Sequence, residues 1–294
     1  MQMGKKTLTT FIIAINLIQA GSALSFDGTI WINQDKTPPG LRHEKFYSQT
    51  MGREIGYIIY TPRDYTSQVR RKFPSIYFLH RKLGDESTEA QVFADWLKSG
   101  ETVSAIVIFP NGGRNSKYMD SVEGSEMHGK IMMESAITRD LVAHVDQHYR
   151  TLREPEGRSI QGFSMGGMGA LRLGFAYPNL FGHIYAFNPA VDDDADNIMI
   201  EEPDLLSKMM AGDPSEWHAR MARTLGVKNA IKLTKISIDI SIGDRDELLP
   251  SVLDLSRALT LVGINHQLKI LPRLDHWYRL GPNFEHVSKK NFGQ

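Results

Sequence analysis

RSIQGFSMGGMGAL, residues 158–171, is the stretch of sequence that decides the fold. Its centre, Gly162-Phe-Ser-Met-Gly166, has the spacing G-x-S-x-G, and the residues before it have the character of a short strand. In this pattern a sharp strand-to-helix turn holds a serine hydroxyl at the end of the strand. The flanking glycines let strand and helix approach closely around a strained serine. The stretch therefore predicts a strand, a tight turn and a helix, with Ser164 as a candidate nucleophile.

Short apolar runs alternate with amphipathic segments on both sides of this turn. The expected strands are two within residues 45–60, joined near Gly52, and single strands at 74–80, 103–110, 158–163, 181–187, 236–242 and 267–271. The expected helices lie at 86–98, 135–149, 167–175 and 250–262. Continuous apolar strands separated by such helices favour a mostly parallel central sheet with helices on both faces. The sequence thus predicts an α/β fold, with an antiparallel pair of strands at its N-terminal edge.

Residues 192–233 interrupt this alternation. They are polar and rich in methionine, and they fall between the sixth and seventh main strands. One interpretation is an insertion that lines a substrate pocket. The other is a helical excursion whose methionines fill gaps in the core.

The composition limits the class of protein. The 294 residues are 41% hydrophobic and contain no linker or repeat, so we expect one domain over residues 24–294. The formal net charge is zero and there is no basic run, which argues against nucleic acid as a partner. The absence of cysteine excludes disulfides and thiolate nucleophiles. We find no zinc-protease, P-loop or dinucleotide motif, so we expect neither a metal nor a cofactor.

The N-terminus has the pattern of a secretory signal. Lys5 and Lys6 precede an apolar run at residues 11–18, and the small residues Ala20-Gly-Ser-Ala23 follow. This order is typical of a cleavable signal peptide, and the apolar run is too short for a good membrane span. The sequence predicts a signal peptide at residues 1–23, a secreted or periplasmic protein, and no stable membrane insertion after cleavage.

A serine nucleophile needs a histidine to accept its proton and an acid to orient that histidine. Where the serine sits on a strand–turn–helix of this kind, the acid and then the histidine follow two later strands. Asp244 and Asp246 both follow the expected strand at 236–242, and His276 follows the strand at 267–271. We therefore take His276 as the base, in preference to His266 and His286. At this point Asp244 and Asp246 remain alternatives for the acid.

The negative oxygen that forms during acyl transfer needs backbone N–H donors. The residue after the nucleophile supplies one of them, here Met165 at the start of the following helix. The other donor normally comes from the loop after the third strand, which here begins His80-Arg-Lys82.

Taken together, these motifs resemble the esterase D and feruloyl esterase group of α/β-hydrolases, which also includes the mycolyltransferases. The resemblance runs from about Phe46 to the C-terminus, and it is strongest over residues 158–189. Further similar segments are NGG at 111–113, YMD at 118–120, GDPSEW at 212–217, the Gly243-x-x-Asp246 acid motif, and His276. The resemblance implies the α/β-hydrolase fold, and it favours Asp246 as the acid.

The chain departs from the family pattern at two loops. Arg81 stands where the family usually has glycine after the third strand, and we place the second oxyanion donor at the N–H of Lys82. Leu274-Asp275 precedes the histidine, where the family often has glycine. We expect both loops to differ from the usual form.

The leading hypothesis is a serine esterase that forms an acyl-enzyme on Ser164. Its substrates would be small-molecule or carbohydrate esters with acetyl, feruloyl or similar acyl groups, contacted by Tyr118, Asp120 and Trp277. The other tryptophans named as pocket candidates are Trp96 and Trp217, although aromatic residues are at least as common in a core. The alternatives are an acyltransferase with the same triad and a non-catalytic binding protein on a hydrolase fold.

Overall fold

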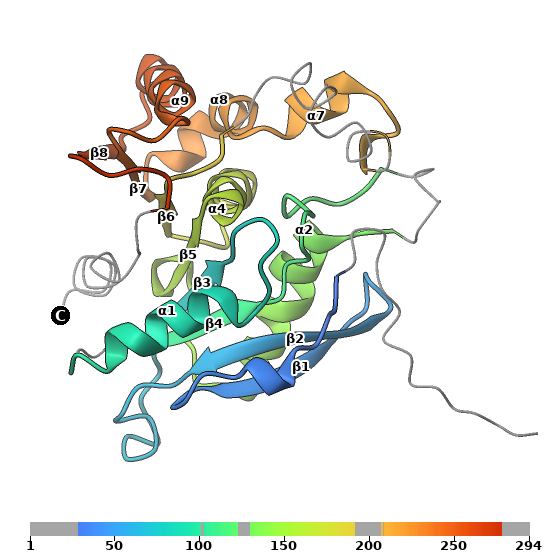
Figure 1. Cartoon of the computed structure of the whole chain (residues 1–294), viewed down its shortest axis with the longest axis vertical. Coiled ribbons are helices and arrows are strands. Elements are labelled where there is room, and N and C mark those ends of the chain that lie inside the picture. The colour runs from blue at the N-terminus through green and yellow to red at the C-terminus, as the bar shows by residue number, and fades with distance from the viewer. Residues whose placement is uncertain (1–28, 101–102, 123–129, 192–206, 208, 278–294) are drawn as a thin grey trace, which may run out of the picture.

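The computed structural model describes residues 29–100, 103–122, 130–191, 207 and 209–277. The predicted signal peptide lies outside these residues, as do 192–206 and 208 of the interrupting segment. The described chain folds around an eight-stranded sheet with the strand order β1-β2-β4-β3-β5-β6-β7-β8 (Figure 1). The pairs β1–β2 and β2–β4 are antiparallel, and every pair from β4 to β8 is parallel. The predicted parallel sheet with an antiparallel N-terminal edge is confirmed.

The strands match the apolar runs of the sequence closely. They are β1 (Arg42–Ser48), β2 (Arg53–Tyr60), β3 (Ser75–Leu79), β4 (Ile106–Pro110), β5 (Arg158–Phe163), β6 (His183–Phe187), β7 (Ser237–Gly243) and β8 (Gln267–Leu271). Three of them, β3, β4 and β5, are buried along their whole length. This burial explains why β3 and β4 are apolar at nearly every position, whereas β5 also buries the polar residues Arg158, Ser159 and Gln161.

The helices lie at the predicted positions, with two additions. They are α1 (Thr88–Leu97), α2 (Met133–Ser135), α3 (Val142–His148), α4 (Met165–Ala176), α7 (Pro214–Arg220), α8 (Ala222–Leu233) and α9 (Leu249–Leu261). Single turns of 3₁₀ helix are η1 (Gln34–Lys36) and η4 (Pro155–Gly157). A π-helical turn, η3 (Ala136–Leu141), joins α2 to α3. The predicted helix at 135–149 is therefore a continuous helical segment that contains one π-helical turn.

The two faces of the sheet bury different clusters of side chains. Along β3, Ile76 and Phe78 pack on the face that α1 covers, whereas Tyr77 and Leu79 join the larger cluster on the face covered by α3, α4 and α8. This alternation is the two-residue period of a strand. Helices on both faces, as the sequence predicted, therefore bury a sheet that is apolar on both sides.

The segment between β6 and β7 contributes to the core where it is described. Met209, Met210 and Met221 are each almost fully buried in the larger cluster, and so is Trp217 of α7. Asp213 caps α7 by accepting the Ser215 N–H at 2.8 Å. In these residues the methionines fill the core, as in the second of the two interpretations.

The parallel strands end at the same level along one edge of the sheet. Leu79 pairs with Gly162, Phe163 with Phe187, and Gly243 with Leu271. The loops that follow β3, β5, β6, β7 and β8 therefore meet at this edge. None of the helices in the described ranges is both long and apolar enough to cross a bilayer.

Candidate active site

Ser164 occupies the tight turn between β5 and α4. Its backbone has φ 56° and ψ −117°, a conformation that residues other than glycine rarely adopt. The turn is fixed to the loop after β6, because Ser164 N–H donates to the Phe187 carbonyl and the Ser164 carbonyl accepts from Ala190 N–H, both at 3.0 Å. These bonds hold the serine in its strained geometry.

The two glycines of the motif are needed for close packing. A side-chain carbon on Gly162 would overlap the backbone of Gly166, and one on Gly166 would overlap the carbonyl of Leu79 at the end of β3. The first turn of α4 thus lies directly against the end of β3. The loop after β3 is brought beside the nucleophile by this contact.

His276 links the serine to an acid. His276 Nε2 lies 2.9 Å from Ser164 Oγ, and His276 Nδ1 lies 2.9 Å from Asp246 Oδ2. A carboxylate only accepts hydrogen bonds, so Nδ1–H donates to Asp246 and leaves Nε2 as the acceptor for the serine hydroxyl. The ring of Phe163, the residue before Ser164, stacks on the imidazole with 5.4 Å between ring centres.

Of the two candidate acids, only Asp246 reaches the histidine. Its side chain is fully buried, and its Oδ1 accepts the Leu248 N–H at 2.9 Å, so both carboxylate oxygens are bonded. Asp244 is exposed, and its backbone N–H donates to the Leu271 carbonyl. The geometry therefore agrees with the choice of Asp246.

The histidine loop is held by a residue that the sequence motifs did not indicate. Asn188, directly after β6, is buried and has φ 39°. Its Nδ2 donates to the carbonyls of Asp275 (3.2 Å) and His276 (3.0 Å), and its backbone N–H donates to the Ser241 carbonyl (2.7 Å). Asparagine tolerates the left-handed region better than most residues. An asparagine directly after an expected strand was the only signal in the sequence.

The second departure from the family pattern, Leu274-Asp275, packs against the loop after β7, which carries Asp246. The Leu274 carbonyl accepts the N–H of Arg245 at 2.9 Å and packs against Gly243, where any side chain would overlap it. The left-handed backbone falls on Arg273, with φ 63°. The histidine loop thus differs from the expected glycine turn but is bonded to the loops on either side.

On the other side of Ser164, the loop after β3 is fixed through His80. The His80 ring is buried, and its Nδ1 lies 2.8 Å from the Arg81 carbonyl while its Nε2 accepts the Gly112 N–H at 2.9 Å. This pairing requires a neutral ring, and burial lowers the pKa of His80 accordingly. The His80 carbonyl accepts the Tyr118 hydroxyl at 3.0 Å.

Arg81, in place of the family glycine, does not take the left-handed conformation. That conformation occurs two residues later, at Leu83, with φ 62°. The Arg81 guanidinium turns to α1 and donates to Glu89 Oε1 at 2.8 Å. The Met165 N–H is at the N-terminal turn of α4, where N–H groups have no partner within the helix and favour negative charge.

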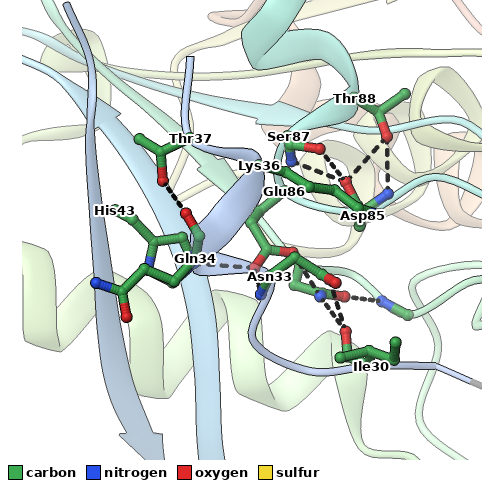
Figure 2. Close-up of polar contacts among 12 residues, drawn as sticks. Ile30, Asn33, Gln34, Lys36, Thr37, His43, Asp85, Glu86, Ser87 and Thr88 are labelled. Atoms are coloured by element: carbon green, nitrogen blue, oxygen red, sulfur yellow. Dashed lines mark hydrogen bonds and ion pairs between the residues drawn. The ribbon is translucent and has the colours of Figure 1, made fainter. Parts of the chain in front are cut away.

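Further along, the same loop is tied to the N-terminal segment through two acids (Figure 2). Glu86 is buried and its carboxylate accepts from four groups: the Asn33 N–H and Nδ2, His43 Nε2 and Asn111 Nδ2. Asp85 accepts from the Ser87 N–H and hydroxyl and pairs with Lys36 at 2.8 Å. The loop from β3 to α1 therefore has fixed ends on both sides of Arg81.

The residues expected to contact substrate lie in different environments. Trp277 is 70% exposed, and its ring meets the His276 ring edge-on, with 5.2 Å between ring centres. Tyr118 is fully buried between the loop after β4 and α4, where it supports His80, so its position differs from the substrate contact that we expected. Asp120 accepts the Ser135 N–H and hydroxyl (3.0 and 2.6 Å), and it too is occupied by a structural contact.

The other two aromatic candidates pack against side chains of the core. Trp96 is partly buried against Phe93 in the α1 cluster, and Trp217 is buried in the larger cluster. Neither is presented to a substrate in the described structure. In the described part of the chain, no three acidic or histidine side chains gather in a way that would hold a metal ion.

A strained serine between β5 and α4, and an acid and a histidine after β7 and β8, define this chain as an α/β-hydrolase with a serine–histidine–aspartate site. Residues 48–272 match the Esterase family, whose description reads "Putative esterase". The chain belongs to this family. The resemblance drawn from the sequence motifs is confirmed.

Three similar proteins illustrate the relationship. "Esterase Rv1288" of Mycobacterium tuberculosis (strain ATCC 25618 / H37Rv) is 28% identical over 154 residues, which are 52% of this chain and 32% of that protein. The chain therefore spans only a part of this relative's length. Among solved structures, the Staphylococcus aureus serine hydrolase FphF aligns with a TM-score of 0.72 at 19% identity, over 87% of this chain and 100% of that one. A structure named as a ferulic acid esterase aligns with a TM-score of 0.69 at 19% identity, over 85% and 97%. These two likenesses concern the fold.

Proposed function

We propose that this protein is a serine esterase that hydrolyses carboxylic esters through an acyl-enzyme on Ser164. The observation that carries the proposal is the continuous hydrogen-bonded chain from Ser164 through His276 to Asp246, with 2.9 Å at each step. Membership of the Esterase family supports the same reaction class.

In the first half of the proposed reaction, Ser164 Oγ attacks the ester carbonyl while His276 Nε2 takes the hydroxyl proton. The imidazolium that forms is stabilised by the buried carboxylate of Asp246. The carbonyl oxygen becomes negative, and the N–H groups of Met165 and Lys82 stabilise it. His276 then returns the proton to the departing alcohol, and the acyl group stays on Ser164.

In the second half, water takes the place of the alcohol. His276 Nε2 accepts a proton from the water as its oxygen attacks the acyl carbonyl, and the same two N–H groups stabilise the second oxyanion. The collapse of this intermediate breaks the acyl–Oγ bond, and the proton passes from His276 back to Ser164. The products are a carboxylic acid and the free enzyme.

The proposed substrates are small-molecule or carbohydrate esters with acetyl, feruloyl or similar acyl groups. The exposed ring of Trp277, beside His276, offers an apolar surface for an acyl or sugar ring. The likeness in fold to a ferulic acid esterase supports aromatic acyl groups as candidates.

The test uses p-nitrophenyl acetate and a fluorophosphonate probe, which reacts with activated serines. We expect wild-type protein to hydrolyse the ester and to be labelled at Ser164. Ser164→Ala is expected to abolish labelling and to reduce hydrolysis to near the uncatalysed rate. Ser67→Ala, at a surface loop serine, serves as the control and is expected to behave as wild type. Equal hydrolysis by Ser164→Ala and wild type contradicts the proposal.

We further propose that residues 1–23 act as a cleavable secretory signal, so that the mature enzyme works outside the cytoplasm. The charged, apolar and small-residue segments of this sequence support the proposal. N-terminal sequencing of the protein recovered from the periplasm or medium of a bacterial host is expected to begin at Leu24. Recovery of the full-length chain in the cytoplasm alone contradicts it.

A further inference from the structure

An ion pair joins the loop between β3 and α1 to the first turn of α1, and the proposed reaction does not use it. Glu89, the second residue of α1, has a side chain only 1% exposed, and its Oε1 accepts the Arg81 guanidinium at 2.8 Å. Its other oxygen, Oε2, is buried and makes no hydrogen bond to another part of the described chain. Arg81 itself is 37% exposed.

Glu89 is an expensive group to bury. Burial raises the pKa of Glu89 to about 7, although Arg81 acts to lower it. The N-terminus of a helix normally favours a carboxylate, so the raised pKa means that desolvation outweighs both the dipole and the arginine. An ion pair with a buried carboxylate is weak evidence of a role in stability, because apolar residues in the same place often stabilise more.

The position of Arg81 gives the pair another role. The Arg81 carbonyl and the Lys82 N–H belong to one planar peptide group and point in opposite directions. The carbonyl accepts from His80 Nδ1–H at 2.8 Å and from the Gly84 N–H at 3.0 Å. These bonds set the carbonyl direction, and the ion pair holds the Arg81 side chain that leaves the same backbone.

We propose that Arg81 and Glu89 are positioning residues of the oxyanion hole. Their ion pair keeps the Arg81–Lys82 peptide in the orientation that directs the Lys82 N–H toward the Ser164 site. In the family this loop usually has a glycine. Here Arg81 stands at that position, and its salt bridge to Glu89 of α1 fixes the loop. The proposal rests on the serine esterase function proposed above.

The first experiment is a double-mutant cycle with Arg81→Met, Glu89→Gln and the double variant, assayed with p-nitrophenyl acetate. A displaced oxyanion donor weakens binding of the transition state and not of the substrate, so kcat is expected to fall while KM changes little. Complete loss of one donor costs about 10²–10³-fold, and we expect a smaller loss, about tenfold, from each single variant. The double variant is expected to lose no more than the worse single variant.

Two further variants separate positioning from general damage. Arg81→Lys keeps the charge and is expected to recover part of kcat. Arg71 is the matched control, because it pairs with Asp64 at 2.8 Å and is 32% exposed, but it lies before β3, at the opposite end of that strand. Arg71→Met is expected to keep the wild-type kcat. Circular dichroism and the thermal midpoint check that each variant is folded at the assay temperature.

A pH profile supplies a readout that a purely structural role would not change. In the described chain, three charged or titratable groups interact with Glu89. Arg81 and Asp85 belong to the loop between β3 and α1, and Tyr118 belongs to the loop after β4. The wild-type kcat is expected to fall on the acid side as the Glu89 carboxylate takes up a proton and the ion pair is lost, and this step is expected to be missing from the Glu89→Gln profile.

The outcomes separate the two proposals. If wild type is active and labelled at Ser164, but Arg81→Met and Glu89→Gln keep kcat within about twofold while folded, the positioning role is wrong and the esterase function stands. A strictly additive cycle also overturns the positioning role. If wild type neither hydrolyses the ester nor reacts with the fluorophosphonate, both proposals fail.

Discussion

Two loops approach Ser164, and they are held by different kinds of bond. The histidine loop after β8 is fixed by neutral groups: Asn188 donates to two of its carbonyls, and the Arg245 N–H donates to a third. The loop between β3 and α1 is fixed by two buried acids, Glu86 and Glu89, with their donors. Hydrogen bonds between neutral groups keep their strength as pH changes, whereas the ion pair of Glu89, whose pKa is raised by burial, is lost when the carboxylate is protonated. We therefore expect the two sides of the site to respond differently to mutation and to pH.

The largest loss of kcat is expected at Asp246, which bonds directly to the catalytic histidine. Asp246→Asn keeps the shape of the side chain but no longer fixes the His276 tautomer or stabilises its cation. Such a change lowers kcat by about 10⁴-fold in the serine protease triad, and we expect a loss of similar order in ester hydrolysis. Asp244→Asn, in the same loop but exposed, is the control and should leave kcat unchanged. A comparable loss from both variants would show that the loop, and not the hydrogen bond to His276, is being tested.

The next largest loss of activity is expected at Asn188, which positions the histidine loop. Asn188→Asp replaces an amide donor with a carboxylate that faces the carbonyls of Asp275 and His276. The repulsion is expected to shift His276, and a shift of about 1 Å costs about 10²-fold in rate. The measurement is the rate of fluorophosphonate labelling of Ser164, together with kcat and KM.

Asn188→Gly distinguishes the amide bonds from backbone strain. Glycine accepts φ 39° freely but has no donor, so it is expected to lower kcat less than Asn188→Asp while still falling below wild type. If both variants label as fast as wild type, the Asn188 amide does not position the histidine.

The same two loops show how far the sequence alone predicts the site. On the histidine side, the signals were local: an acid and a histidine directly after apolar strands, in the order that the nucleophile turn requires. The parallel register then brought Ser164, Asp246 and His276 together. The parallel sheet and the helices of both faces followed from the same apolar runs.

On the other side, the contacts join residues that the sequence does not mark. Glu89 has the pattern of an ordinary helix residue, and only its burial against Arg81 makes it unusual. Tyr118 lies in a motif near the pocket, but its hydroxyl turns inward to the His80 carbonyl. Whether a polar side chain faces substrate or core depends on packing between segments that are distant in the sequence. The spacing of apolar residues along the chain carries no information about such packing. Asn188 was missed for the same reason, because its partners are 87 and 88 residues away.

A smaller effect is expected on the stability of the protein, through Glu89 beside the loop between β3 and α1. Burial raises the pKa of Glu89 from an ordinary value of 4.5 to about 7 in the fold. The folded protein therefore holds this proton more tightly, and the resulting stability is complete below about pH 4.5 and is lost as the pH rises to about 7. The full difference is at most about 3 kcal/mol. Glu89→Gln cannot titrate, so its thermal midpoint relative to wild type is expected to rise between about pH 4.5 and 7.

The control for this measurement is Ser67→Ala, at the exposed loop serine used above. This variant changes no titratable group, so its midpoint should differ from wild type by the same amount at every pH. A Glu89→Gln difference that stays constant with pH would mean that Glu89 is ionised to the same extent in the folded and unfolded protein.

The smallest effect is expected at Trp277. Its substitution tests whether the histidine loop also binds substrate. The ring is exposed beside His276 and supports no buried contact with the core clusters of the described chain, so Trp277→Ala should leave folding and kcat for the acetyl ester close to wild type. Loss of an aromatic partner is worth about 0.5–1.5 kcal/mol beyond area burial, which corresponds to a few-fold rise in KM for a feruloyl ester. Trp277→Phe should recover most of that rise, because it keeps an aromatic face. An equal rise in KM for the acetyl and feruloyl esters would instead assign Trp277 to the alcohol side of the substrate, since the acyl group is the only part that differs when both are p-nitrophenyl esters.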